Sequence, residues 1–404
     1  MGSQLRAIKV TENVYWVGAI DWALRDFHGY STNRGTTYNA FLILADKITL
    51  IDTVKHHFQD ELLARISSMV KPQDIDIIIS NHAEMDHSGC LPQIIKYVQP
   101  SKVYASVRGK QALAEHFRRK PHLSIVEVVK SGDTINLGNL TLQFLETPML
   151  HWPDSMFSYL VEEKLLFSQD AFGMHLATGK RFADQIADEI LEYEAAKYYA
   201  NILLPYSKLI TKLLGKVSSL GLEFDIIAPD HGPIWRSNVN KIISLYARWA
   251  EQKPTPRIII TYDTMWQSTA LMARAIANGA IDQGVSVKVM PLSANHRSDI
   301  ATELLNAAAL VVGSPTINNN IFPTIADLFC YIRGLKRKNL CGFAFGSYGW
   351  SGESIKQVEE SLKTMGVEIT GECIKAKYVP DEQVLEKCYN QGEDLAKKIK
   401  NICV

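Results

Sequence analysis

Two closely spaced prolines divide the 404-residue chain into two parts whose patterns differ, and this division constrains the fold more than any other feature. Both lie in the segment Glu251-Gln-Lys-Pro-Thr-Pro256, directly after an amphipathic stretch at 239–250 that is typical of a helix. Proline fixes φ and lacks a backbone N–H, so the helix cannot continue through this segment. We predict a first domain at 1–250, a linker at 251–256 and a second domain at 257–404.

Beyond the linker, apolar strands alternate with helical stretches. Strands are expected at 257–263, 285–291, 309–316, 340–347 and 375–379, and helices at 267–283, 299–307, 323–335, 353–364 and 381–400. Regular alternation of this kind predicts an α/β domain with a doubly wound parallel sheet.

Before the linker, strands and helices follow one another less regularly. Short apolar runs predict strands at 41–44, 48–52, 75–80, 102–106, 141–147, 156–161, 164–170 and 224–230, and helical periodicity appears at 58–70, 89–98, 108–118, 185–200 and 207–219. Many strands interspersed with helices indicate an α/β domain in which helices cover the faces of sheets.

Ionisable side chains of the first domain cluster just past its apolar strands. The segment His82-Ala-Glu-Met-Asp-His87 follows the strand at 75–80, and further candidates follow three later strands. The full set is His82, Glu84, Asp86, His87, His151, Asp170 and His231. Because buried carboxylates and imidazoles need partners, the set predicts a site for two divalent cations. Polar loops that satisfy one another without a metal are the alternative.

The composition of this set narrows the choice of metal. It has four imidazoles and three carboxylates but no thiolate. Oxygen donors mixed with nitrogen favour iron or manganese, and three carboxylates stabilise the charge of ferric ions. Zinc accepts the same donors, so a binuclear zinc hydrolase remains an alternative.

In the second domain, three loops at strand ends are candidates for binding FMN. They contain Thr264, Met265, Trp266, Gln267, Ser268 and Thr269; Ser314, Pro315, Thr316, Ile317, Asn318 and Asn319; and Gly346, Ser347, Tyr348, Gly349, Trp350, Ser351 and Gly352. Hydroxyls and N–H groups at a helix start suit a monophosphate, and neither G-x-G-x-x-G nor Walker A is present. Glycines admit a planar ring, on which Tyr348 or Trp350 could stack. A flavin-free signalling domain, and core packing for Trp266, are the alternatives.

The overall composition excludes some classes of partner. Lys plus Arg and Asp plus Glu both number 43, which argues against a nucleic acid or a membrane surface as partner. No apolar run approaches the roughly 20 residues of a membrane span, and the N-terminus lacks the apolar core of a signal peptide. A cytoplasmic location is therefore expected. The six cysteines form no C-x-x-C pair, so we expect free, buried thiols.

The pattern H-x-E-x-D-H with later His, Asp and His resembles the metallo-β-lactamase superfamily, whose hydrolases carry H-x-H-x-D-H. Glu84 in place of the second His resembles the flavodiiron proteins, or A-type flavoproteins. The segments Asp21-Trp-Ala-Leu-Arg-Asp-Phe-His-Gly-Tyr30 and Gly35-Thr-Thr-Tyr-Asn39 also look like motifs of that family. The similarity covers essentially the whole chain. It implies a metallo-β-lactamase-like αββα sandwich followed by a flavodoxin-like domain.

The resemblance also implies roles for individual residues. One iron would be held by His82, Glu84 and His151, the other by Asp86, His87 and His231, with Asp170 bridging them. His175 and Tyr198 would hydrogen-bond a bound gas or its product, and His28 would face the site. For Tyr198, simple packing is the alternative.

A protein of this family would use two irons and FMN to reduce a diatomic gas. Dioxygen would give water, and nitric oxide would give nitrous oxide. Within the family the chain resembles most closely the methanogen members, which oxidise a reduced deazaflavin coenzyme, whereas rubredoxin is the donor for many others. The resemblance implies a head-to-tail homodimer or a dimer of dimers. A third alternative is an electron-transfer protein with FMN but a degenerate, metal-free first domain.

Overall fold

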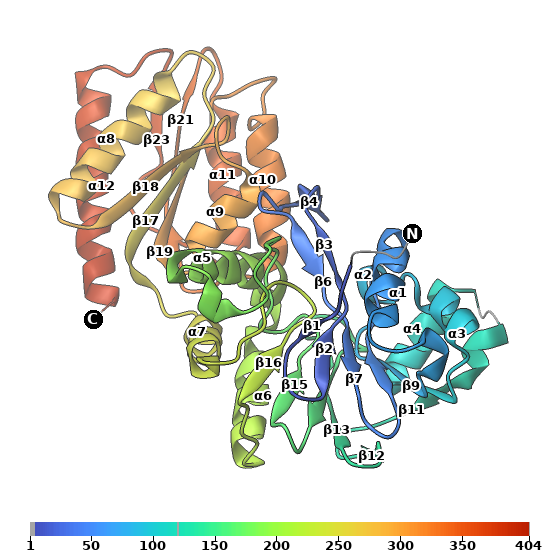
Figure 1. Ribbon diagram of the computed structural model, residues 1–404. Coiled ribbons are helices and arrows are strands. Elements are labelled where there is room, and N and C mark those ends of the chain that lie inside the picture. The colour runs from blue at the N-terminus through green and yellow to red at the C-terminus, as the bar shows by residue number, and fades with distance from the viewer. Residues whose placement is uncertain (1–4, 119–120, 404) are drawn as a thin grey trace. The chain divides into compact units, whose positions relative to one another are not determined.

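The computed structural model describes residues 5–118 and 121–403, which form two compact units (Figure 1). The first unit comprises the chain up to Phe27, Thr32–Tyr198 and Lys208–Ala247. The second comprises His28–Ser31, Tyr199–Ser207 and the chain from Arg248 onward. Two short segments that precede the double proline therefore pack with the second unit.

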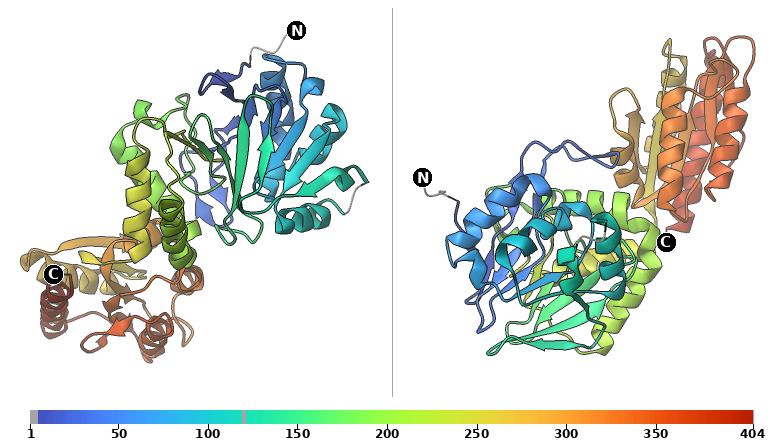
Figure 2. Two further views of the ribbon diagram at one scale, coloured as in Figure 1. Left: turned by 90° about the horizontal axis from the view of Figure 1, so that it is seen from below. Right: turned by 90° about the vertical axis from the view of Figure 1, so that its right-hand side faces the viewer.

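Two sheets stack face to face in the first unit (Figures 1 and 2). In spatial order the larger contains β1 (Ile8–Lys9), β2 (Val14–Trp16), β7 (Phe41–Ile43), β8 (Thr49–Ile51), β9 (Ile77–Ser80), β10 (Lys102–Ala105) and β11 (Val126–Val128). The smaller contains β12 (Thr134–Asn136), β13 (Thr141–Glu146), β14 (Met156–Leu160), β15 (Leu165–Phe167) and β16 (Ile226–Ala228). A ribbon of β3 (Ala19–Asp21) and β6 (Thr36–Tyr38) stands apart from them. Two further short strands are β4 (Asp26–Phe27) in this unit and β5 (Tyr30–Ser31) in the second unit.

The helices that precede the double proline are α1 (Gln59–Ser67), α2 (Met85–Ser88), α3 (Leu91–Val98), α4 (Val107–His116), α5 (Asp188–Tyr198), α6 (Ser207–Ser219) and α7 (Val239–Glu251). Of these, α1, α3 and α4 cover the outer face of the larger sheet, and α6 lies beside the smaller sheet. Shorter 3₁₀ turns lie at His56–Phe58, Pro72–Asp74, Pro121–Ile125, Ala183–Gln185 and Leu204–Tyr206, and a π-helical turn lies at Tyr199–Leu203.

Both faces of the larger sheet are buried, which explains its continuous apolar runs. Phe41 points toward the smaller sheet, where its ring centroid lies 5.3 Å from that of Phe167. Its neighbour Leu42 points the other way and packs in the core that contains Leu62 of α1 and Ile94 of α3. The predicted αββα sandwich is thus confirmed.

A parallel sheet with helices on both faces forms the second unit (Figures 1 and 2). Its strands are β17 (Thr255–Tyr262), β18 (Ser286–Pro291), β19 (Ala307–Gly313), β20 (Cys341–Gly342), β21 (Ala344–Tyr348), β22 (Glu368–Ile369) and β23 (Ile374–Lys377). The central strand β17 pairs with β18 on one side and β19 on the other, and β19 continues to β21 and β23. This is the flavodoxin-like strand order, with its switch point between the ends of β17 and β19. The predicted doubly wound sheet is confirmed.

Two helices share one face of this sheet at very close range. They are α8 (Ser268–Asp282) and α12 (Glu382–Ile402), whereas α9 (Arg297–Leu304), α10 (Pro323–Leu335) and α11 (Glu353–Thr364) cover the other face. A Cβ at Gly279 would lie 2.0 Å from the carbonyl oxygen of Tyr389, and one at Gly392 would lie 2.1 Å from that of Ile276. The absence of side chains at these two glycines lets the helices approach.

The structure differs locally from the sequence-based expectation. The predicted helix at 185–200 ends at Tyr198, where a π-helical turn follows, and the predicted strand at 340–347 is split into β20 and β21. The sequence analysis did not predict the strands β1 to β6, β11, β12 and β22, because segments of two or three residues carry little periodicity. Helix α7 ends at Glu251 and β17 begins at Thr255, so the connection is shorter than the expected linker.

No helix in the described ranges is both long and apolar enough to cross a membrane. The cysteines are free, and Cys330 is exposed rather than buried as expected, while Cys90, Cys341 and Cys388 lie in the core.

Candidate functional site

The seven predicted ligands lie together at the end of the sandwich where the strands β9, β15 and β16 lead into loops. Their candidate ligand atoms fall into groups in which all atoms lie within 4.8 Å of one another. All are buried except His151, which is partly exposed. The short helix α2 begins just after Glu84, and its single turn carries Asp86 and His87. One compact loop therefore supplies four of the seven side chains.

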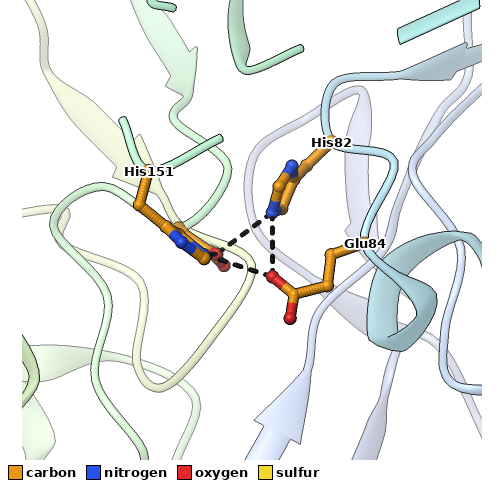
Figure 3. Close-up of side chains that lie close together, drawn as sticks. His82, Glu84 and His151 are labelled. Carbon is orange, nitrogen blue, oxygen red and sulfur yellow. Dashed lines mark hydrogen bonds and ion pairs between the residues drawn. The ribbon is translucent and has the colours of Figure 1, made fainter. Parts of the chain in front are cut away.

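One half of the cluster consists of His82, Glu84 and His151 (Figure 3). The Oε2 atom of Glu84 lies 3.3 Å from Nε2 of His82 and 3.2 Å from Nε2 of His151. The Oδ2 atom of Asp170 lies 2.8 Å from Nε2 of His151 and 3.5 Å from Nε2 of His82. Two imidazoles and two carboxylates thus converge on one small volume.

The other half consists of Asp86, His87 and His231. The Oδ2 atom of Asp86 lies 3.3 Å from Nε2 of His87 and 3.2 Å from Nε2 of His231. The Oδ1 atom of Asp170 lies 3.2 Å and 3.4 Å from the same two nitrogens. Asp170 therefore turns one oxygen toward each half.

Groups behind the rings fix which nitrogen faces inward. Nδ1 of His82 lies 3.0 Å from Oδ2 of Asp154, and Nδ1 of His231 lies 2.6 Å from the carbonyl oxygen of Thr37. Asp230 lies behind His87, with its Oδ2 3.5 Å from Nδ1, but makes no hydrogen bond with it. Partners of this kind orient ligating imidazoles. The sequence analysis missed all three, although Asp230 directly precedes a predicted ligand.

The opposite charges of the cluster stabilise one another. Burial by itself raises the pKa of Asp170, but the charge of His87 and a hydrogen bond to His151 outweigh it and hold the pKa well below its usual range. For His87, burial lowers the pKa, yet the charges of Asp86 and Asp170 raise it well above its ordinary value. The carboxylates are thus ionised and the surroundings strongly favour positive charge.

A donor set of this kind fits metal ions. Both oxygens of Asp86, Oδ1 of Asp170 and both ring nitrogens of His87 are buried without a hydrogen-bond partner. Leaving buried polar atoms unsatisfied is costly, so such a concentration of orphaned donors and acceptors needs a ligand. Nitrogen and oxygen donors without thiolate suit iron, manganese or zinc.

Two of the three predicted catalytic residues lie beside the second half of the cluster. Nδ1 of His175 is 2.9 Å from Oγ1 of Thr36, and its ring centroid is 4.7 Å from that of His231 and 5.1 Å from that of Tyr198. Burial, followed by the charge of His231, lowers the pKa of His175 well below its usual range. Burial, followed by the charge of Asp170, raises the pKa of Tyr198. Both groups are therefore neutral. His28 belongs to the second unit, and its role stays a prediction.

The three predicted flavin loops line one cavity of about 540 Å³ in the second unit. Among the predicted residues, those that line it are Met265, Trp266, Ser268, Pro315, Thr316, Asn318, Asn319, Ser347, Tyr348, Gly349, Trp350 and Ser351. Tyr378 and Val379, just past β23, also line it and were missed, although the end of a predicted parallel strand was a usable signal. A cavity at the carboxyl ends of the strands lies where this fold binds ligands.

Other predicted residues of these loops do not line the cavity. They are Thr264, Gln267, Thr269, Ser314, Ile317, Gly346 and Gly352. Thr269 and Ser314 are fully buried, and a hydrogen bond of 3.2 Å joins Thr269 to Ser347 across two loops. The alternative of core packing for Trp266 is wrong, because 89% of its surface is exposed.

Fold and site together define a class of two-domain protein that joins a binuclear metal cluster to a flavodoxin-like cofactor domain. Residues 36–232 match the model of the ODP family beta lactamase, and residues 260–392 match that of flavodoxin. The nitric oxide reductase of Moorella thermoacetica is 45% identical, over 97% of this chain and 98% of its own length.

Solved structures agree along the whole chain. The rubredoxin oxygen:oxidoreductase of Desulfovibrio gigas superposes with a TM-score of 0.96 and 43% identity, covering 98% of this chain and 99% of that one. The flavodiiron protein of Giardia intestinalis gives a TM-score of 0.95 and 31% identity, covering 100% and 99%. The chain belongs to the flavodiiron proteins, a family of oxidoreductases that carry a di-iron site and FMN.

Proposed function

We propose that this protein reduces dioxygen to water at a pair of irons, with electrons that enter through FMN from a reduced deazaflavin coenzyme. The observation that carries the proposal is the convergence of three carboxylates and four imidazoles into two halves that share Asp170. Two irons bound there would form a redox-active site that binds a diatomic gas. FMN would accept two electrons together and pass them on one at a time.

In this proposal each half of the cluster holds one iron. His82, Glu84 and His151 would hold the first, and Asp86, His87 and His231 would hold the second, while Asp170, which turns one oxygen toward each half, would serve both. Glu84 distinguishes this set from a zinc hydrolase, because it adds an anionic oxygen where such hydrolases carry a second imidazole. A hard anionic donor favours iron over a softer metal.

Tyr198 and His175 serve as hydrogen-bonding groups beside the cluster. The raised pKa of Tyr198 keeps its phenol protonated, so the hydroxyl can donate a hydrogen bond to a bound gas or its reduced product. Thr36 orients the His175 ring through a hydrogen bond to Nδ1. The other ring nitrogen, Nε2, is not used by this bond. Both side chains are 1% exposed, which keeps bulk water away from this part of the cluster.

Metal and flavin analysis tests the proposal against the zinc hydrolase and against an electron-transfer protein. Protein purified without air from its native host should contain iron and FMN in a ratio of about two to one. Zinc in place of iron, with hydrolysis of a β-lactam or thioester, would establish the hydrolase. FMN without any metal would establish the electron-transfer protein.

Substrate and electron donor are tested together in four assays that are set up without air. The reduced deazaflavin coenzyme or reduced rubredoxin is mixed with the enzyme, and dioxygen or nitric oxide is then added. The proposal requires oxidation of the coenzyme that depends on enzyme and dioxygen and that yields water rather than hydrogen peroxide. Turnover with rubredoxin alone would replace the proposed donor, and faster turnover with nitric oxide would replace the proposed substrate. The named relatives, a nitric oxide reductase and a rubredoxin oxygen:oxidoreductase, make both alternatives concrete.

The two candidate sites belong to different compact units, and we include in the proposal a head-to-tail dimer in which the flavin of one chain serves the irons of the other. Mixing two inactive variants tests it. A variant without metal and a variant without flavin, unfolded and refolded together, regain activity if a mixed dimer carries one intact pair of sites. Sedimentation should show the dimer, and a fully active monomer would contradict it.

A further inference from the structure

The two halves of the metal cluster have the same set of donors but different surroundings. Each half offers two imidazoles and one carboxylate of its own, and one oxygen of Asp170 faces each half. The donors alone therefore give the two halves similar affinities for a divalent cation. A difference in how the halves hold a metal ion must come from the groups around them.

Packed aromatic rings surround the half formed by Asp86, His87 and His231, which we call the enclosed half. The side chain of His87 is 0% exposed and that of His231 is 1% exposed. Four further rings of the first unit lie around the imidazole of His231, with centroid distances of 6.3, 5.9, 4.7 and 6.1 Å for Phe27, Tyr38, His175 and Tyr198. Water or a chelator can reach the enclosed half only when such side chains move apart.

The half formed by His82, Glu84 and His151, which we call the open half, contains the most exposed of the seven side chains. The side chain of His151 is 14% exposed, whereas that of His82 is 0% exposed. His151 comes from the connection between β13 and β14, apart from the loop that carries His82 and Glu84 (Figure 3). Among the described residues, the rings near it are those of His82 and Trp152, and Trp152 is itself partly exposed. Solvent therefore meets the cluster at His151.

His151 also lacks a polar partner behind its ring. Oxygen atoms lie 3.0, 3.5 and 2.6 Å from Nδ1 of His82, His87 and His231. For Nδ1 of His151, residues 5–118 and 121–403 provide neither a hydrogen-bond partner nor an ion pair. Loss of a partner behind a ligating imidazole typically weakens metal binding by about 10–100-fold. His151 is thus both the most exposed ligand and the least supported one.

We propose that the open half exchanges its metal ion with the solution, whereas the enclosed half retains its ion. His151 detaches first, because no hydrogen bond at Nδ1 holds its ring. A one-metal form, with the enclosed half occupied, is then a stable state of the protein, and the open half takes up a divalent first-row cation from solution. The inference rests on the metal pair of the proposed function but not on the gas or the electron donor.

Release of iron from the reduced holoenzyme tests this difference. In excess ferrozine, a ferrous chelator, and without air, about one iron per chain should appear in a fast phase, and the second should follow at least about tenfold more slowly. His151→Ala should lack the fast phase and keep the slow one. Release of both irons from the wild type in one phase would overturn the proposal. So would a His151→Ala variant that retains only the fast phase or that contains no iron.

Phe27→Ala tests whether the surrounding rings cause the slow release. Removing the Phe27 ring opens one side of the enclosed half, so the slow phase should become faster while the fast phase stays unchanged. Tyr97→Ala, at an exposed ring of α3, is the control and should change neither phase. An unchanged slow phase in Phe27→Ala would overturn the role of the rings. If the native metal proved to be zinc, the same two phases should appear with a zinc-binding dye, so failure of the proposed gas reduction and failure of this inference are distinguishable.

Discussion

The metal cluster and the flavin cavity are built on opposite principles. The cluster is a buried set of charges in which His82 and Asp170 are almost inaccessible. The cavity is an open site at strand ends, whose rim includes Trp266 and Trp350 with 89% and 86% of their surfaces exposed. In the cluster every side chain must be neutralised by its neighbours, so residue identity is tightly constrained. In the cavity, the loops at the strand ends place backbone and hydroxyl groups around the binding space. The position of a residue therefore matters more there than its type.

If residue type is tightly constrained in the cluster, a substitution of Asp170 should have the largest effect. Asp170→Asn removes a charge that faces four imidazoles, so both halves of the cluster should lose metal, and gas-reducing activity should fall by more than about 100-fold. Flavin content should not change. Iron and FMN analysis of the purified variant checks this, with Asp60→Asn at an exposed site of α1 as the control. Full iron content in the Asp170 variant would show that the cluster tolerates a different residue at this position.

A substitution at Gly279 should act on the second unit alone. A Cβ there would lie 2.0 Å from the carbonyl oxygen of Tyr389, so Gly279→Ala forces α8 and α12 apart and should lower the free energy of unfolding by about 1–3 kcal/mol. Denaturant unfolding followed by flavin fluorescence measures it. Gly334→Ala, in α10 with no atom near the new Cβ, is the matched control and should be neutral or slightly stabilising. Equal stability of the two variants would mean that the helices adjust freely.

The rim of the flavin cavity should show a smaller, graded effect. Trp350→Ala removes an exposed ring and should weaken FMN binding by about 3–10-fold, because a stacked aromatic pair contributes about 0.5–1.5 kcal/mol. Trp350→Phe keeps a ring and should bind FMN nearly as the wild type does. Titration of the apoprotein with FMN gives the two dissociation constants. A loss above 100-fold for either variant would contradict the idea that position dominates over identity here.

Tyr198 gives an effect of the same size as Trp350, on turnover instead of FMN binding. Tyr198→Phe removes one hydroxyl beside His175, so the turnover number should fall by about 3–10-fold, the value of one neutral hydrogen bond, with iron content unchanged. Steady-state turnover of the iron-replete variant measures it. The exposed Tyr97→Phe serves as the control. Unchanged turnover in the Tyr198 variant would favour simple packing.

The contrast also explains how much could be predicted from the sequence. All seven residues of the metal cluster were predicted, because buried charges past apolar strands stand out as residue types, and Glu84 set the pattern apart. Their supports at Asp154 and Asp230 were missed, because a lone aspartate in a loop has no distinctive spacing. In the cavity, the three loops were predicted from strand ends, but which of their residues line it, and the contribution of Tyr378, depend on backbone conformation that no local pattern encodes.

The same limit applies to the elements. Long periodic helices such as α6, α10 and α11 lie at the predicted residues, because an amphipathic face specifies them locally. The short strands β1 to β6 owe their form to tertiary pairing, which is why they could not be predicted.

The contact between α8 and α12 has a consequence for biosynthesis. These helices are the first and the last of their unit along the chain, and together they cover one face of the sheet. At ribosomal speeds of about 5–20 residues per second, that apolar face stays uncovered for on the order of ten seconds while the intervening residues emerge. The face is therefore fully covered only after α12 has been translated, so we expect FMN to bind after synthesis of the whole unit.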